Sequence, residues 1–273
     1  KSEVSISNEW SFHRYFDFGM DNYDISESSL IDAIKKANNG EFIHIYLLIN
    51  GVDIRLNELL FPKLENIIKD FECRVLRGLN SCGVSPAYLK ECGKNLGAAV
   101  SGGADSVALL ISLAHILKGS GIKLCVINVN HNMRRKDESE ADSVFVKDFC
   151  ENLNAQGFDV SVFVHEIAQG LVFRIADERK NGLEEAARFL RYKAFEEFSA
   201  RQNTAFICLA HNRNDALETS LMRFLQGSSG SIAAVRENYI RPLLDISREE
   251  IEAYLTAQNI SWRTDTTNFD ENY

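Results

Sequence analysis

The stretch Ala98–Leu110, AAVSGGADSVALL, decides the fold of this chain. Leu96–Val100 (LGAAV) is a short apolar run typical of a buried strand, and residues 106–118 have the apolar periodicity of a helix. Between them lies the sequence Ser101-Gly102-Gly103-Ala104-Asp105-Ser106. Two adjacent glycines permit a tight turn that brings backbone N–H groups together, and the following helix adds its N-terminal donors and positive dipole end. The pattern predicts an anion-binding loop between a strand and a helix.

The side chains of this loop favour a phosphate ligand. Asp105 places a carboxylate where a divalent cation bridging to phosphate would neutralise it, and the hydroxyls of Ser101 and Ser106 are able to donate to phosphate oxygens. The same residue types also form ordinary turns and helix N-caps, but the flanking strand and helix favour the anion site. The chain contains neither the GxxxxGK[ST] of a Walker A loop nor the GxGxxG of a dinucleotide fold.

From about residue 96 onward, strand-like segments alternate with helix-like ones. Further strands are expected at 122–129, 158–165 and 205–210, and further helices at 138–153 and 183–201. This alternation predicts an α/β fold with a mostly parallel sheet, helices on both faces, and ligands outside the carboxyl ends of the strands.

The first 90 or so residues have a different pattern. They contain a strand candidate at 42–48 and a helix candidate at 59–79, but no glycine loop. We therefore expect residues 1–92 to form an additional N-terminal module of unknown role and residues 93–273 to form the catalytic domain.

Composition excludes several classes of protein. The 273 residues are 45% hydrophobic and 25% charged, which is close to the globular average, and no apolar run is long enough to span a membrane. The six cysteines form no CxxC pair, so we expect reduced, buried thiols in a cytoplasmic protein. The formal net charge of −9 argues against a nucleic-acid interface that covers the whole surface.

Two further stretches carry polar groups at the expected ligand edge of the sheet. The strand at 122–129 is followed by His131 and then by Arg134. In the helix at 183–201, Glu184, Arg188 and Arg191 share one face at helical spacing. A packing histidine and an exposed helix with an ion pair are the plainer alternatives.

A third stretch follows the strand at 205–210. Asp215 and Glu218 are three residues apart, so they share a helix face and would form a paired-carboxylate pocket suited to an ammonium group. Helix capping is the alternative role for residues of this type at this position.

These motifs carry a resemblance to a known family. The glycine loop resembles the PP-loop of the ATP pyrophosphatases, which cleave ATP between the α and β phosphates. From about residue 93 to 273, the ordered set is similar to the tRNA(Ile)-lysidine synthetases, although Asn212 stands where many members have a second histidine. The set comprises VNH at 129–131, LEEAARFLRY at 183–192, AHNRNDALET at 210–219, QGS at 226–228, RPLL at 241–244, SREE at 247–250, WRTD at 262–265 and TN at 267–268.

The resemblance implies a fold of the adenine nucleotide alpha hydrolase type and a specific reaction. Family members use ATP and Mg²⁺ to adenylate the wobble cytidine of tRNA(Ile) with the anticodon CAU, and the ε-amine of free lysine then attacks C2. By this resemblance, the tRNA-binding part of the family would follow Tyr273, and a homodimer is left open.

The resemblance also implies roles for individual residues. Asp105, Arg191 and Asp215 would be catalytic, with Asp105 also the metal ligand. Lysine and the tRNA would contact Asp215, Glu218, Arg188 and Arg191. The nucleotide would be bound by Ser101, Gly102, Gly103, Asp105, Ser106, His131 and Arg134.

Two other functions remain open at this point. Another PP-loop enzyme would transfer the adenylyl group to a different acceptor, as in tRNA thiolation or amidotransfer, but thiolation generally needs cysteines that are often arranged as CxxC. A catalytically silent nucleotide-binding module need not retain Asp105, Asp215 and Glu218, all of which are present.

Overall fold

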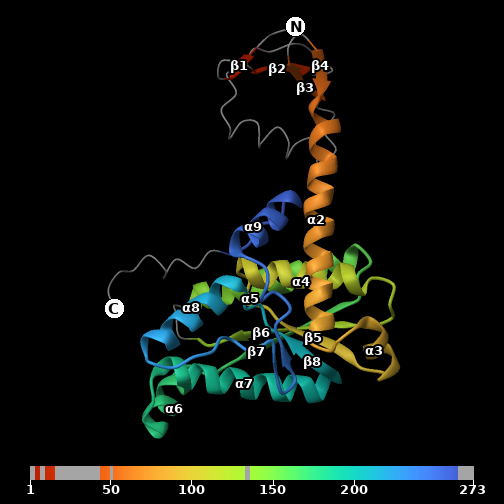
Figure 1. Ribbon diagram of the computed structural model, residues 1–273. Coiled ribbons are helices and arrows are strands. Elements are labelled where there is room, and N and C mark those ends of the chain that lie inside the picture. Colours follow the sequence, from red (N-terminus) through yellow and green to blue (C-terminus); the bar gives the residue numbers. More distant parts are fainter. Residues whose placement is uncertain (1–3, 7–9, 16–43, 50–51, 133–135, 264–273) are drawn as a thin grey trace. The chain divides into compact units, whose positions relative to one another are not determined.

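The computed structural model describes residues 4–6, 10–15, 44–49, 52–132 and 136–263 (Figure 1). The chain divides into two compact units, the first running to Ile68 and the second from Lys69 onward, apart from the short stretch Ala257–Asn259 that is grouped with the first.

The first unit contains a four-stranded antiparallel sheet. Its strands are β1 (Val4–Ile6), β2 (Trp10–Tyr15), β3 (His44–Ile49) and β4 (Val52–Arg55), in the order β1-β2-β3-β4. Only β3 overlaps a strand expected from the sequence. Helix α2 (Leu56–Ser81) follows β4 directly and is longer at both ends than the expected helix at 59–79.

The second unit is built on a six-stranded sheet with the order β7-β6-β5-β8-β10-β9. Every neighbouring pair is parallel except β10 and β9. The strands are β5 (Asn95–Ala99), β6 (Leu124–Asn130), β7 (Val160–Glu166), β8 (Thr204–Cys208), β9 (Val235–Arg236) and β10 (Tyr239–Ile240). The prediction of a mostly parallel sheet is confirmed.

Helices connect these strands. They are α3 (Pro86–Glu91), α4 (Ala104–Leu117), α5 (Lys136–Ala155), α6 (Leu171–Arg179), α7 (Leu183–Gln202), α8 (Arg213–Leu225) and α9 (Arg248–Ala257). Figure 1 shows α4 and α5 on one face of the sheet and α7 on the other, as the alternating pattern predicted. No helix in the described part of the chain combines the length and the apolar character that crossing a membrane requires.

Successive side chains of each strand point to opposite faces of the sheet, so each strand contributes to the core on both faces. Cys125 and Ile127 of β6 pack with Phe195 and Phe198 of α7. Asn128, the next residue after Ile127, faces the opposite way, where its side chain accepts a hydrogen bond from the Ser143 hydroxyl of α5 at 2.9 Å. The central strands are thus buried on both faces, which explains why they are continuous apolar runs in the sequence.

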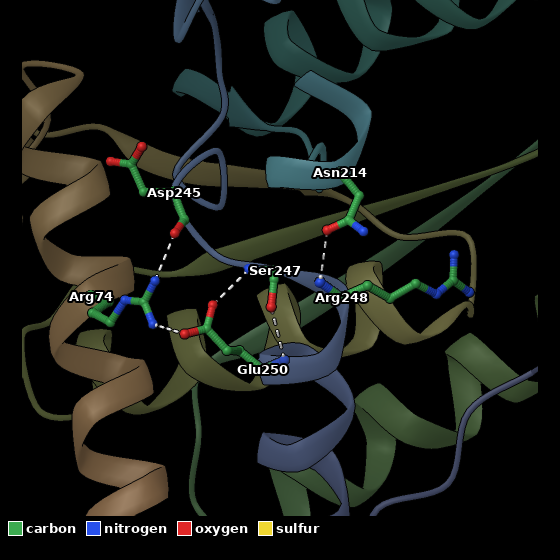
Figure 2. A network of polar contacts seen from close by, with 6 residues as sticks. All are labelled: Arg74, Asn214, Asp245, Ser247, Arg248 and Glu250. Carbon is green, nitrogen blue, oxygen red and sulfur yellow. Dashed lines mark hydrogen bonds and ion pairs between the residues drawn. The ribbon is translucent and has the colours of Figure 1, made fainter. Parts of the chain in front are cut away.

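A polar network links the second-unit part of α2 to the start of α9 (Figure 2). The Arg74 guanidinium forms an ion pair with Glu250 and donates to the backbone carbonyl of Asp245 at 2.6 Å. Glu250 also accepts from the Ser247 N–H at 2.8 Å, and the Ser247 hydroxyl accepts from the Glu250 N–H at 3.3 Å, which is a reciprocal capping box. The hydrogen bond from Arg74 lowers the pKa of Glu250 to about 2.

This network predicts a pH-dependent contribution to stability. Because the pKa of Glu250 falls from its ordinary 4.5 to about 2, the charged form stabilises the fold at neutral pH and the effect is lost as the pH falls through this interval. We expect Glu250→Gln to reduce the free energy of unfolding by about 1 kcal/mol at pH 7, since partial exposure screens the pair, and by less at pH 3. Urea denaturation at both pH values measures the difference.

Glu252→Gln is the matched control for this variant. Glu252 pairs with Arg248 at 3.3 Å on the exposed side of α9, so its loss should change stability by only about 0.3 kcal/mol. An equal loss for Glu250→Gln at pH 7 and pH 3 would contradict the assigned role of the carboxylate.

Candidate active site

A cavity of about 420 Å³ opens at the carboxyl ends of the central strands. The strand order reverses between β5 and β8, because β5 connects to β6 on one side while β8 connects toward β10 on the other. Parallel sheets bind ligands at such a reversal. The lining residues are Ala99, Val100, Ser101, Gly103, Asp105, Ser106, Ile127, Val129, His131, Arg188, Arg191, Tyr192, Phe195, Leu209, Ala210, His211 and Asp215.

The glycine loop after β5 is organised by the hydroxyl of Ser106. Its oxygen accepts from the backbone N–H groups of Ser101 at 3.2 Å and Gly102 at 3.1 Å, and its proton is donated to the Gly103 carbonyl at 2.9 Å. Ser106 is buried, so this hydroxyl holds the loop together. The sequence suggested a phosphate contact for Ser106, whereas in the structure its hydroxyl proton is engaged within the loop.

Gly102 has a left-handed backbone that favours glycine. Its φ angle is +98°, and a Cβ at this position would lie 3.4 Å from Phe145 and 3.5 Å from Arg263. The Gly102 carbonyl accepts from the Arg263 N–H at 2.9 Å, and the Arg263 guanidinium donates to Asp142 of α5 at 2.9 Å. The segment after α9 therefore returns to brace the glycine loop.

Asp105 lies in the first turn of α4 and faces the cavity. Burial raises the pKa of its carboxyl group, while the Asn212 side chain and the charge of Arg248 partly oppose the rise. Its Oδ1 atom is buried without a hydrogen-bond partner among the described residues. A carboxylate oxygen left in this state fits a hard cation such as Mg²⁺, which is commonly held by one or two carboxylates together with substrate phosphates.

The cations of the cavity come from α7. Arg188 donates to the Tyr192 hydroxyl at 3.3 Å and stacks over the ring of Tyr192 with 5.0 Å between the guanidinium and the ring centroid. Much of the Arg191 side chain is exposed, but protein atoms surround its guanidinium. This local burial, and then repulsion from Arg188, lowers the pKa of Arg191. Glu184, expected on the same helix face, is exposed and does not line the cavity.

His131 enters the cavity from the end of β6. Burial, together with repulsion from Arg191 and His165, lowers the pKa of its imidazole to about 4, so the ring is neutral at pH 7. Its Nδ1 atom is buried without a hydrogen-bond partner within the described residues. Arg134, which was expected to lie near the nucleotide with His131, falls outside the described residues.

The residues after β8 form another part of the cavity lining. The Asn212 side chain caps α8 by accepting from the N–H groups of Asn214 at 2.8 Å and Asp215 at 3.1 Å. In return, the Asp215 carboxylate accepts from the Asn212 N–H at 2.9 Å, which completes a capping box. Asp215 also lines the cavity, but Glu218 is exposed on α8 and does not. The structure thus brings one of the two paired carboxylates to the cavity.

Two residues had no role in the sequence-based prediction: His211, which lines the cavity, and Arg241, which contacts His211 but does not line the cavity. His211 directly follows the apolar run at 205–210, which extends two residues beyond β8, and it contacts the guanidinium of Arg241 from the segment after β10. Its position at the carboxyl end of a strand was a usable signal, whereas the contact with Arg241, 30 residues away, was not visible in the sequence.

Comparison with known proteins identifies the family of this chain. The model of the PP-loop domain family matches residues 83–273, so the chain belongs to the PP-loop family. The sequence is similar to the tRNA(Ile)-lysidine synthases of Treponema denticola, at 41% identity over 77% of this chain and 45% of that protein, and of Caldanaerobacter subterraneus, at 37% identity over 64% and 36%. The resemblance inferred from the motifs is confirmed, and the chain spans less than half the length of these curated relatives.

A solved structure shares the fold. The U34-tRNA thiolase NcsA from Methanococcus maripaludis, with its [4Fe-4S] cluster, superposes with a TM-score of 0.56 at 18% identity, covering 73% of this chain and 67% of that one. At this identity the likeness concerns the fold alone.

The loop geometry predicts the effect of removing one hydroxyl. Ser106→Ala removes two acceptor contacts and one donor contact that shape the glycine loop, so we expect the affinity for ATP to fall about tenfold. Isothermal titration calorimetry measures the affinity. Ser112→Ala is the matched control, because its buried hydroxyl donates to helix carbonyls of the same α4 away from the loop, and its loss should leave ATP affinity unchanged. Unchanged affinity in Ser106→Ala would contradict the organising role.

Proposed function

We propose that this chain carries the catalytic unit of an ATP-dependent lysidine synthetase, which joins the ε-amine of free L-lysine to C2 of the wobble cytidine of tRNA(Ile) with the anticodon CAU. In the first step, the C2 oxygen of the cytidine attacks the α-phosphorus of ATP and pyrophosphate leaves. In the second, the lysine amine attacks C2, the C2–O bond breaks, AMP leaves, and the amine loses a proton.

The observation that carries the proposal is the composition of one cavity. A glycine loop, two arginines and a carboxylate converge there from three elements that are distant in the sequence. The glycine loop suits the phosphates of ATP, the arginines suit the charge that develops on the α-phosphate, and Asp215 suits the ammonium group of an amino acid. The names of the curated relatives support this assignment.

In adenylyl transfer, Arg188 and Arg191 would stabilise the charge that builds on the nonbridging oxygens of the α-phosphate. Burial lowers the pKa of Arg191, but the guanidinium keeps its charge at pH 7, because arginine is not deprotonated in proteins. Asp105 would hold Mg²⁺, which when bound neutralises the departing pyrophosphate. The first turn of α4 adds backbone donors, since the first N–H groups of a helix have no carbonyl partner within it.

In the second step, Asp215 would orient lysine by pairing with an ammonium group other than the one that attacks. The side chain is held by its cap to Asn212, so the carboxylate is preorganised. The pKa of His131 near 4 makes this imidazole a weak base for the attacking amine, and its assigned role is to contact the nucleotide.

The chemistry of the cavity disfavours sulfur transfer as the reaction. None of the described residues that line the cavity is a cysteine, and no cluster of three or more metal-ligating side chains occurs in the described part of the chain. Four of the six cysteines are buried, and burial raises the pKa of Cys125, Cys150 and Cys208, which suppresses the reactive thiolate.

Incorporation of labelled lysine into tRNA tests the proposed function. The protein is incubated with ATP, Mg²⁺, radiolabelled lysine and tRNA(Ile) bearing CAU, and acid-precipitable label is counted. We expect label in the tRNA together with AMP and pyrophosphate, and none in a control tRNA whose wobble base is uridine. AMP formation without lysine in the tRNA, when a positive-control enzyme is active, would refute the acceptor that we propose.

We further expect Asp215, rather than Glu218, to matter for lysine binding. Asp215→Asn retains an oxygen that is able to accept from the Asn212 N–H but removes the charge, so we expect the KM for lysine to rise about 10- to 100-fold with little change in the KM for ATP. Glu218→Gln is the matched control, because Glu218 is exposed outside the cavity lining, and it should behave like the wild type. Equal increases in the two KM values for Asp215→Asn would refute the lysine-binding role.

A further inference from the structure

His211 is a cavity residue to which the proposed reaction has so far given no role. It follows β8 within the backbone segment Leu209–Asn212, in which the Leu209 N–H donates to the Ile240 carbonyl at 2.8 Å. The imidazole lies among charged groups, with Arg241, Arg188 and Arg191 as cations and Asp215 as the anion. Burial, followed by the charge of Arg241, lowers its pKa, so the ring is neutral at pH 7.

The contact that distinguishes His211 is a hydrogen bond from a buried arginine. The Nε atom of Arg241 donates to Nδ1 of His211 at 3.3 Å, and Nη1 of Arg241 donates to the Ala233 carbonyl at 2.8 Å. Arg241 is only 5% exposed. Among the described residues, no carboxylate forms an ion pair with it, which is unusual for a buried guanidinium.

This contact determines which nitrogen of the imidazole carries the proton. A guanidinium has only donors, so the Nδ1 atom that it contacts must present a lone pair. In a neutral ring the single proton then lies on Nε2. His211 lines the cavity, and its Nε2 atom lies on the side of the ring away from Arg241, so the ring carries an N–H donor rather than a lone pair on that side.

We propose that Arg241 is a positioning residue that fixes His211 as the Nε2–H tautomer, and that His211 donates this proton in a hydrogen bond to an α-phosphate oxygen during adenylyl transfer. The proton stays on His211 throughout, so the residue stabilises charge and does not act as the base. The catalytic half of this inference rests on the proposed function, whereas the tautomer does not.

Nuclear magnetic resonance tests the tautomer without any reaction. In ¹⁵N-labelled protein at pH 7, long-range ¹H–¹⁵N correlation distinguishes protonated from unprotonated ring nitrogens, and the His211 signals are assigned by their absence in His211→Gln. We expect unprotonated Nδ1 and protonated Nε2 in the wild type, and a mixture of tautomers in Arg241→Met. Arg223→Met is the matched control, since it removes an exposed guanidinium that donates to Ser231. Protonated Nδ1 in the wild type, or an unchanged single tautomer in a folded Arg241→Met, would overturn the assignment.

Two substitutions of His211 itself test the donor role even if Arg241→Met fails to fold. The amide nitrogen of Gln occupies a position like Nε2 and is able to donate, whereas the side chain of Asn reaches only as far as Nδ1. We expect pyrophosphate release to stay within about tenfold of the wild type in His211→Gln and to fall about 100- to 1,000-fold in His211→Asn, as when an oxyanion donor is removed. The pH profile of His211→Gln should match that of the wild type.

Losses of equal size in His211→Gln and His211→Asn, or loss of a limb of the pH profile in His211→Gln, would overturn the donor role in favour of a base. These outcomes are distinct from failure of the proposed function. If lysine does not enter tRNA but the tautomer and its dependence on Arg241 are as expected, the acceptor is wrong and the positioning role of Arg241 stands.

Discussion

Strand β5 is hydrogen-bonded to β6 along one edge and to β8 along the other, and the cavity depends on this double pairing. A strand in the middle of a parallel sheet must pack on both faces, and β5 has little room to do so. A Cβ on Gly97 would lie 3.0 Å from the side chain of Ile207 and 3.3 Å from the ring of Phe198. The absence of a side chain at Gly97 lets β8 and α7 approach, so the loops after β5 and β8 end at one place.

The glycine loop depends on contacts from several parts of the chain. Ser106 holds it from inside, and Arg263 holds the Gly102 carbonyl from the segment after α9. That segment is in turn connected to α9, whose start is bound to Arg74 of α2. The same helix α2 approaches the sheet region closely, because a Cβ on Gly78 would lie 2.1 Å from the Pro242 carbonyl oxygen. Residues remote from the chemistry thus support the shape of the loop.

Local charge in the cavity differs from the charge of the whole chain. The formal net charge is −9, yet Arg188 and Arg191 line the cavity and Arg241 lies behind His211. Charges that converge on one cavity set the local potential there, whatever the net charge of the whole chain. Overall charge therefore did not predict the local charge of the cavity, whereas the helix face shared by Arg188 and Arg191 did place both arginines in its lining.

The sequence by itself determined the class of fold, the position of the glycine loop and the helix face that carries Arg188 and Arg191, because these follow from periodicity within short segments. Only the tertiary structure decided that Asp215 lines the cavity while Glu218 does not, since helical spacing says which residues share a face but not how far along the helix the cavity extends. The short strands β9 and β10 and the pairing of Arg241 with His211 were likewise unpredictable, because they depend on contacts between distant segments. The sequence pattern put Ser106 in the glycine loop. Only the structure shows that its hydroxyl donates to a carbonyl of the loop itself, because a buried polar group needs a hydrogen-bond partner nearby.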